Sequence, residues 1–365
     1  MMRGLLMLLL VLVTSNNSRA DHALRPIELT KGIGRIETAA LGDGDVKLLA
    51  FDRTTSKTTL IRVAGALAGI ETAASVNVTG CELSQGDMGF AVTRVAGWVV
   101  GCQVVEGEDG LRPVAAQIGR AGVRYISLWR RGHEDNLFLA SPCKDGSIWA
   151  GGFEAISSNE VANEPVMLRV KDDGRFKPFR LKAALGFSSL EYAIVDCTLM
   201  VGASFDSSDS PSAFWAALPG RTQVLVRGKG DHSPLDFASA TISGNSLYMA
   251  GSEHSSDLVG SCKKAITIRR YSLPSLAMGG KKELPVHCDS EVFLAPTPEK
   301  GGVAAVVVSE QVNQVFLLDN NLTKMKVYPL PHLPELRGVL ATRDALVLYG
   351  GDEEAFAAML PWPTE

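Results

Sequence analysis

Short apolar runs recur along the whole chain, and turn residues bound each of them. In the clearest example, residues 145–153, an Asp-Gly turn leads into an apolar run that ends on a glycine pair. A polar stretch follows, then a second apolar run over residues 165–170 and a tight turn at 172–174. Short apolar runs between turn signals are typical of strands buried on both faces. The pattern therefore predicts an all-β chain of short antiparallel strands.

The residue that ends each long apolar run recurs at a nearly constant spacing. Successive steps between these residues are 50, 50, 51, 49, 57 and 42. A period near 50 residues is typical of a propeller with blades of kelch-like length. We therefore predict a seven-bladed β-propeller. The seven marker residues are Phe51, Gly101, Gly151, Gly202, Gly251, Val308 and Gly350.

Each repeat divides into four antiparallel strands, which we denote A to D from the hub outward. The long apolar run is strand B; strand A precedes it across a tight turn, and strands C and D follow. Pro178, Pro285 and Pro329 all fall in D segments. Proline cannot donate to a sheet ladder, so it belongs on an outer edge strand. The proline positions therefore support the predicted strand order.

The seventh repeat lacks a fourth strand, because the chain ends at residues 361–365. Residues 24–30, near the other end of the chain, resemble the D segment 175–181 in length, basic start and proline. We expect residues 24–30 to supply the missing outer strand and to close the ring. Closure leaves only short sheet edges exposed.

Two motifs resemble known repeat families. The strings DGSIWAGGF and LRVKDDGRFKPF look like the repeats of bacterial delta-60-type secreted propellers, and the glycine pairs 151–152 and 350–351 look kelch-like. This resemblance implies a propeller fold and an exported location. It implies no activity, because propellers host many functions.

The first 20 residues read as a cleaved signal peptide, with Arg3, a short apolar core and small residues at Ser18 and Ala20. The apolar core is short for a membrane span. We expect residues 21–365 to form a single propeller domain that is periplasmic or extracellular and is not inserted in a membrane. The net charge of −4 gives no reason to expect a nucleic-acid partner.

Six cysteines follow the signal segment, and an even number in an exported chain suggests disulfides. In a four-stranded meander, the A–B and C–D turns lie on one rim of the ring, and the B–C and D–A connections lie on the other. Sorting the cysteines by rim favours the pairs Cys81–Cys102, Cys143–Cys197 and Cys262–Cys288. Free buried thiols remain the alternative.

The B–C/D–A rim, which we call the long-loop rim, is the expected binding face. Its B–C connections at residues 153–164, 205–212 and 253–264 are long, and long loops on a rigid scaffold commonly carry function. The alternative is that these loops are long only because loops tolerate changes in sequence and length, and that they carry no function. Residues 128–131, which end a D strand, are interpreted as a solvated edge.

Acidic and histidine side chains on the long-loop rim are the candidate site residues. A cluster of such residues suits cation binding or acid–base chemistry, although solvated loop residues are the simpler interpretation. The cysteines have no metal-ligand spacing, and no catalytic motif or cofactor signature is found. The candidates are Glu154, Asp206, His254, Asp257, His133, Glu134 and Asp135.

These features predict an exported binding or scaffold module that recognises a protein, peptide or glycan through the long-loop rim. The alternative is an exported enzyme, either a hydrolase or lyase or a metal- or quinone-dependent oxidoreductase, with its site at the mouth of the central channel. The sequence specifies neither the ligand nor the oligomeric state, the organism or glycosylation at Asn77 and Asn321.

Overall fold

The computed structural model describes residues 23–363 apart from short internal stretches. Those stretches are 30–31, 43–44, 56, 64–69, 82–87, 105–110, 131–133, 158–159, 181–188, 195–196, 198, 206–212, 219–220, 228–234, 254–265, 287–289, 299–300, 311 and 353. The predicted signal segment, residues 1–20, lies outside the described residues. None of the described residues forms a helix of the length and apolarity that crossing a membrane requires.

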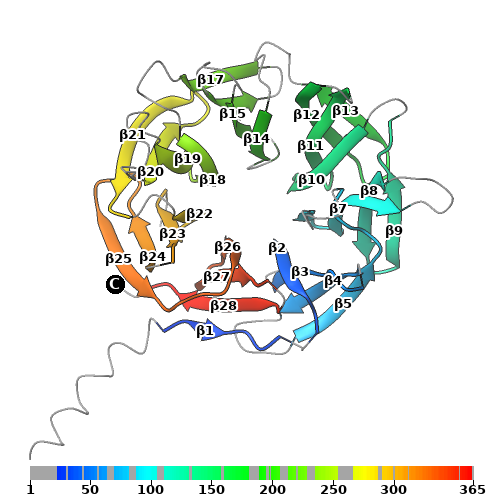
Figure 1. Ribbon diagram of the computed structural model, residues 1–365, viewed down its shortest axis with the longest axis horizontal. Helices are drawn as coiled ribbons and strands as arrows, with labels where there is room; N and C mark the ends of the chain where they lie inside the picture. The colour runs from blue at the N-terminus through cyan, green and yellow to red at the C-terminus, as the bar shows by residue number, and fades with distance from the viewer. Residues whose placement is uncertain are drawn as a thin grey trace, which may run out of the picture.

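The strands form four-stranded antiparallel sheets arranged radially in a ring, which is a β-propeller (Figure 1). Three sheets come from the first half of the chain. They are β2 (Arg35–Gly42), β3 (Asp45–Asp52), β4 (Lys57–Val63) and β5 (Ile70–Val76); β6 (Gly89–Val92), β7 (Gly97–Val104), β8 (Leu111–Gly119) and β9 (Gly122–Ser127); and β10 (Glu134–Pro142), β11 (Ile148–Ser157), β12 (Glu160–Val170) and β13 (Phe176–Arg180).

The second half of the chain continues the same order around the ring. Its sheets are β14 (Ser189–Ile194), β15 (Met200–Phe205), β16 (Ala213–Leu218) and β17 (Arg221–Arg227); β18 (Leu235–Ser243), β19 (Ser246–Glu253), β20 (Ile266–Ser272) and β21 (Ala277–Leu284); and β22 (Glu291–Pro296), β23 (Val303–Val308), β24 (Asn313–Leu318) and β25 (Met325–Leu330). The described residues hold one further sheet, in the order β1-β28-β27-β26, which makes seven sheets in all among them. Its strands are β1 (Arg25–Pro26), β26 (Leu336–Ala341), β27 (Ala345–Gly350) and β28 (Phe356–Pro361).

The second strands contain apolar runs because their two faces pack against different neighbouring sheets. In β23, Val303, Ala305 and Val307 belong to a cluster with Tyr248 of the preceding sheet. Ala304 and Val306, which alternate with them, belong to a cluster with Leu346 of the following sheet. Successive strand residues point to opposite faces, so a strand between two sheets is apolar at every position.

Glycines at the ends of the second strands are required by close backbone packing. A Cβ on Gly101 would overlap the carbonyl oxygen of Thr79, and a Cβ on Gly350 would overlap that of Glu335. The glycine that marks the sequence period therefore sits where another segment crosses the end of the strand without room for a side chain.

The segment near the N-terminus completes the sheet formed by the last strands of the chain, as predicted. Strand β1 is antiparallel to β28, with Arg25 opposite Met359 and Pro26 opposite Ala358. The Ile27 backbone N–H then donates to the Ala357 carbonyl at 2.9 Å. Ile27 and Leu29 are half-buried against the cluster shared by this sheet and the sheet of β2–β5.

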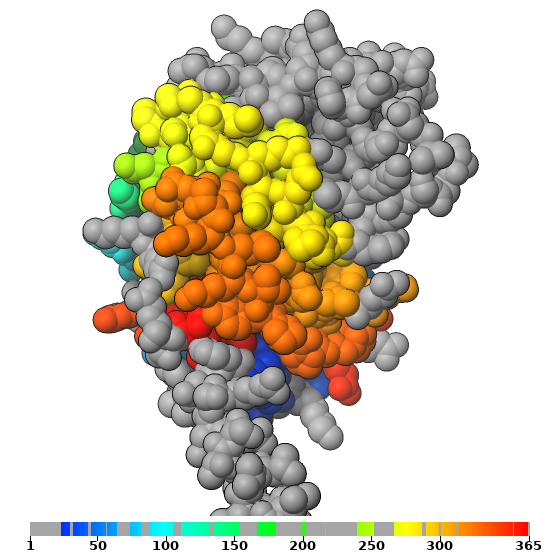
Figure 2. All heavy atoms as spheres, turned by 90° about the vertical axis from the view of Figure 1, so that its left-hand side faces the viewer, coloured from blue at the N-terminus to red at the C-terminus, as the bar shows by residue number. Residues whose placement is uncertain are grey.

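The outermost strands form the solvated wall of the ring. Figure 2 shows the segments of β21 (yellow) and β25 (orange) lying beside each other on this wall. Met278 and Val327 are exposed there. Pro178 and Pro329 lie in the outer strands β13 and β25, as predicted, whereas Pro285 falls just beyond the end of β21.

The prediction of a long loop is wrong for one of the three B–C connections. Residues 153–164 were expected to form an irregular B–C connection, but β11 and β12 continue through them, with Ser157 opposite Glu160. Polar residues continue this hairpin because a pair of strands extending past the core needs no apolar face. Residues 206–212 and 254–265, which hold most of the other two expected loops, lie outside the described residues.

The closing segment gives a test of stability. Replacing both Ile27 and Leu29 with Ala is expected to lower the free energy of unfolding by about 2 kcal/mol, because two half-buried apolar side chains are lost where the ring closes. Urea denaturation measures the change. Glu28→Ala, at an exposed position of the same segment, is the control. Equal stabilities of the double variant and the control would contradict the role of this segment.

Candidate functional site

One group of aromatic and charged side chains on the long-loop rim lies where the sheet of β6–β9 meets the sheet of β10–β13. We call the group of Arg112, Trp129, Arg130 and Asp135 the Trp129 corner. Arg112 is near the start of β8, and Trp129 and Arg130 follow β9 directly. Asp135 is the second residue of β10. In this meander, the start of β8, the end of β9 and the start of β10 all lie on the long-loop rim. The four residues are therefore on the same rim.

Trp129 is an exposed aromatic side chain with a fixed neighbour. The Leu128 backbone N–H donates to the Pro113 carbonyl at 2.9 Å, which continues the β8–β9 ladder one step beyond β9. The next cross-strand position brings the Arg112 guanidinium to 4.5 Å from the centre of the Trp129 ring. Trp129 remains 41% exposed. A cation–π contact restricts the ring while leaving much of its surface open for contact with a ligand.

Arg130, the residue after Trp129, forms a buried, bidentate ion pair with Asp135. Arg130 Nε donates to Asp135 Oδ2 at 2.7 Å, and Arg130 Nη2 donates to Asp135 Oδ1 at 2.5 Å. Their side chains are 10% and 1% exposed. The interpretation of residues 128–131 as a solvated edge is therefore wrong for Arg130. Because the guanidinium fork matches both carboxylate oxygens, the pair joins the residues that follow β9 to the start of β10.

The disulfide Cys81–Cys102 borders the Trp129 corner and confirms the predicted pair. Cys102 exchanges backbone hydrogen bonds of 2.7 and 2.8 Å with Thr79, in the connection between β5 and β6. The Leu137 backbone N–H of β10 lies 3.4 Å from Cys81 Sγ. The bond therefore holds a connecting segment against strands of two neighbouring sheets.

The predicted site residues that are described lie on β10 and β11. In the ladder of these strands, Glu134 is opposite Ala155 and Asp135 is opposite Glu154, so the backbones of Glu134, Asp135 and Glu154 are brought together. Four other predicted residues lie outside the described residues: His133, Asp206, His254 and Asp257. Within the described part of the chain, no three His, Cys, Asp or Glu side chains are placed to hold a metal ion.

Sequence reasoning missed the Arg112–Trp129 contact and the Arg130–Asp135 pair. The signal for the first was the register of the β8–β9 hairpin, since Val114 opposite Ser127 extrapolates to Arg112 opposite Trp129. The signal for the second was the short spacing of two opposite charges across a connection between blades. Neither signal identifies a contact until the strand ends are known.

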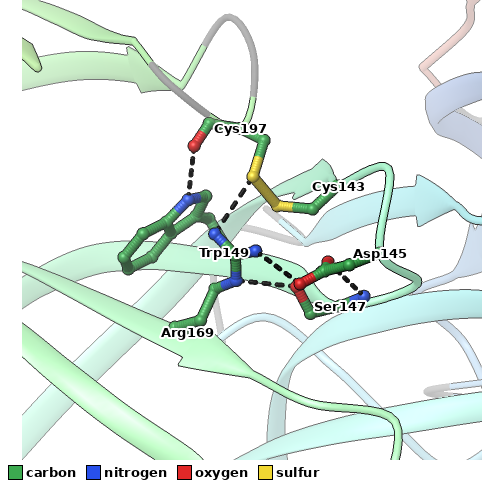
Figure 3. The surroundings of a disulfide bond; sticks show 6 residues. All are labelled: Cys143, Asp145, Ser147, Trp149, Arg169 and Cys197. Carbon is green, nitrogen blue, oxygen red and sulfur yellow. Dashed lines mark hydrogen bonds and ion pairs between the residues drawn. A yellow bond between two sulfur atoms is a disulfide. The ribbon is translucent and has the colours of Figure 1, made fainter. Parts of the chain in front are cut away.

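A second polar cluster lies on the opposite rim, around the other predicted disulfide that the structure describes (Figure 3). Cys143 and Cys197 join the turn before β11 to the turn before β15, and so connect neighbouring blades. The Trp149 indole N–H donates to the Cys197 carbonyl at 2.7 Å. The Arg169 guanidinium lies 5.2 Å from the centre of the Trp149 ring. The third predicted pair, Cys262–Cys288, lies outside the described residues.

Asp145 in this cluster is a strongly stabilised carboxylate. The Ser147 hydroxyl donates to Asp145 Oδ1 at 2.6 Å, and the Ser147 backbone N–H donates to the same oxygen at 3.1 Å. Arg169 Nη2 lies 3.0 Å from Asp145 Oδ2. The Ser147 hydroxyl, then its backbone N–H, with a further contribution from Arg169, lower the pKa of Asp145 from the usual 3.8 to about 2.

Solved structures similar to this chain support the propeller architecture and nothing finer. A puromycin hydrolase structure matches with a TM-score of 0.62 and 14% identity, over 89% of this chain and 52% of that one, so this chain spans about half its length. The Pan2 WD40 domain of Neurospora crassa matches with a TM-score of 0.58 and 13% identity, over 91% of both chains. Virginiamycin B lyase from Staphylococcus aureus matches with a TM-score of 0.58 and 12% identity, over 92% of this chain and 99% of that one.

No protein-family model and no curated protein sequence matches this chain. The delta-60 and kelch resemblances therefore stand at the level of the fold alone, which the similar structures support. Identities of 12–14% show a shared fold and do not transfer an activity.

The buried ion pair predicts a large cost for removing one partner. Asp135→Ala is expected to lower the free energy of unfolding by about 3 kcal/mol, because the Arg130 guanidinium is left buried without its carboxylate. Urea denaturation measures the difference. Asp173→Ala, which removes the exposed partner of Arg175, is the matched control and is expected to cost less than about 1 kcal/mol. Similar effects of the two substitutions would contradict the assignment.

Asp145 gives a prediction of pH dependence. Its pKa is lowered by folding, so its contribution to stability is present above about pH 4 and is lost as the pH falls toward 2. A carboxyl titration by NMR is expected to place the pKa of Asp145 near 2, and Ser147→Ala is expected to move that pKa upward. The pKa of Asp173, which Arg175 lowers, serves as an internal reference that Ser147→Ala leaves unchanged. An ordinary pKa for Asp145 in the parent protein would refute this account.

Proposed function

We propose that this chain is an exported β-propeller that binds a protein, peptide or glycan through its long-loop rim. The observation that supports this function best is the Trp129 corner. Trp129 is 41% exposed, and Arg112 restrains its ring from one side. Exposed, restrained aromatic and arginine side chains are the residues most often responsible for affinity at binding surfaces.

The contacts that hold the residues next to Trp129 also support this proposal. Arg130 and Asp135 are buried and bonded through both carboxylate oxygens. Trp129 is therefore held by Arg112 at its ring and by the ion pair of the next residue. The disulfide Cys81–Cys102 stiffens the adjoining connection. A surface that is already ordered loses less conformational entropy on binding, which favours recognition of a ligand over a structural role for this rim.

We further propose that the described sheets are the blades of a closed, seven-bladed ring, and that residues 21–365 act as one domain after removal of a signal peptide at residues 1–20. Two disulfides support transport to an oxidising compartment, periplasmic or extracellular. The pairing of β1 with β28 supports closure of the ring.

The alternative is an exported enzyme with its site at the mouth of the channel. It is kept because the fold also occurs in structures named as enzymes, a puromycin hydrolase and virginiamycin B lyase. Its candidate residues are Asp206, His254, Asp257 and His133, together with Glu134 and Glu154. Elemental analysis of the purified protein separates the two ideas, because a stoichiometric metal lost in His254→Ala or Asp206→Ala supports the enzyme.

Binding through the rim is tested by screening the purified protein against immobilised glycans and a displayed peptide library, and then measuring the best ligand by calorimetry. Trp129→Ala is expected to weaken that ligand by about tenfold, which is the usual effect of removing a central aromatic contact. Met278→Ala, at an exposed apolar residue on the outer strand β21, is the control and should leave the affinity within about twofold. A ligand whose affinity is unchanged in Trp129→Ala would place the binding face elsewhere.

A further inference from the structure

The disulfide between Cys143 and Cys197 has a cation in direct contact with one of its sulfur atoms. Arg169 Nη1 donates to Cys197 Sγ at 3.1 Å (Figure 3). Cys143 is 6% exposed, whereas Cys197 is half-buried. Cys197 is therefore the more exposed residue of the pair, and its sulfur is the one beside the guanidinium.

Arg169 is held in place by several partners at once. Its Nε donates to Ser147 Oγ at 2.6 Å, and its Nη2 lies 3.0 Å from Asp145 Oδ2. The Trp149 ring covers another side of the guanidinium at 5.2 Å. The strand β12 that carries Arg169 is paired with β11 along its length. The cation therefore remains beside Cys197 whether the sulfur is in a disulfide or is a free thiolate.

A fixed arginine affects the two redox states of a cysteine pair unequally. A neutral disulfide sulfur accepts only a weak hydrogen bond, whereas a thiolate gains a full ion pair with the guanidinium. An interaction that stabilises the reduced form makes a disulfide easier to reduce.

The other described disulfide provides an internal comparison. Cys102 is 1% exposed, and the contact of Cys81 is with the backbone N–H of Leu137 at 3.4 Å. Cys81 is half-buried, as Cys197 is. A backbone amide carries no net charge, so the hydrogen bond from Leu137 stabilises a thiolate at Cys81 less than the Arg169 guanidinium does at Cys197.

We infer that Cys143–Cys197 is a thiol–disulfide exchange site, which a dithiol opens in preference to Cys81–Cys102. The first thiolate of the dithiol attacks Cys197 Sγ, the S–S bond breaks, and Cys143 leaves with the electron pair and takes up a proton. The second thiol of the dithiol, as its thiolate, then attacks the dithiol's own sulfur in the mixed disulfide, and Cys197 leaves as a thiolate beside Arg169. The dithiol becomes a disulfide, having given two electrons to the protein.

Opening this bond removes a covalent link between two blades. The bridge joins positions 54 residues apart, in the turns before β11 and β15. The hydrogen-bonded ladders of the two sheets, β10–β13 and β14–β17, do not depend on it. Reduction therefore loosens the contact between these blades on the rim opposite the Trp129 corner while leaving each sheet intact.

The test is a redox titration of the folded protein in mixtures of reduced and oxidised dithiothreitol, with free thiols alkylated and each cysteine pair quantified by mass spectrometry. Cys143–Cys197 is expected to open at a ratio of reduced to oxidised reagent about tenfold lower than Cys81–Cys102 does. Arg169→Gln is expected to make the Cys143–Cys197 pair about tenfold harder to reduce, which corresponds to about 30 mV. Arg175→Gln, at an exposed arginine of the same blade, is the control and should leave both midpoints unchanged.

Asp145→Asn tests the same idea in the opposite direction. It removes the carboxylate that partly neutralises Arg169, so the pair is expected to become easier to reduce. Arg169→Lys, which keeps the charge, should stay closer to the parent than Arg169→Gln does, and circular dichroism checks that each variant is folded. If both disulfides open together, or if the Arg169→Gln and Asp145→Asn midpoints equal that of the parent, the inference is wrong.

Discussion

The structure depends on burying both faces of the second strand in each sheet. Strand β23 sends alternate residues into two different apolar clusters, one shared with the preceding sheet and one with the following sheet. A sheet built in this way cannot bury its apolar surface alone, since it needs a neighbour on each side. The first and last sheets therefore have to meet, and the cluster that holds Ile36, Leu48, Val347 and Tyr349 is where they do. Pairing of β1 with β28 ties this junction by linking the two ends of the chain.

The same dependence explains which features could be predicted from the sequence. Burial of both faces produces continuous apolar runs, so the second strands were recognisable without any structure. Close backbone crossings at Gly101 and Gly350 make glycine recur at the strand ends, which set the repeat. Because the meander alternates between two rims, the position of a cysteine in the repeat limits its partners. That reasoning predicted Cys81–Cys102 and Cys143–Cys197, and both are confirmed.

The candidate site was predicted less well, for a physical reason. The rim was identified from loop lengths, but β11 and β12 stay paired as far as Ser157 and Glu160, with a register shift between Ala155 and Ser157. Polar residues can continue a strand pair beyond the core, so their presence does not distinguish such a hairpin from a loop. Asp135 was selected as a rim residue that could bind a cation or act in acid–base chemistry, with a solvated loop residue as the alternative, and it is buried against Arg130. Contacts of this kind depend on where each strand ends and on how the chain turns between blades. A period near 50 residues does not contain that information.

The two rims of the ring have different characters. The Trp129 corner holds an exposed aromatic ring and a buried ion pair, and the opposite rim holds a disulfide whose sulfur contacts Arg169. Both groups lie at the junction of adjacent blades, where side chains from two sheets meet on a rigid support.

Closure of the ring by its N-terminal strand is the central claim, and native-state hydrogen exchange tests it most directly. The Ile27 amide donates to Ala357, and the Val306 amide belongs to the buried strand β23. If the ring unfolds as a unit that β1 closes, these two amides should exchange with similar free energies of opening. Exchange of the Ile27 amide at the rate of an unstructured terminus, with Val306 still protected, would show that the ring holds together without this strand.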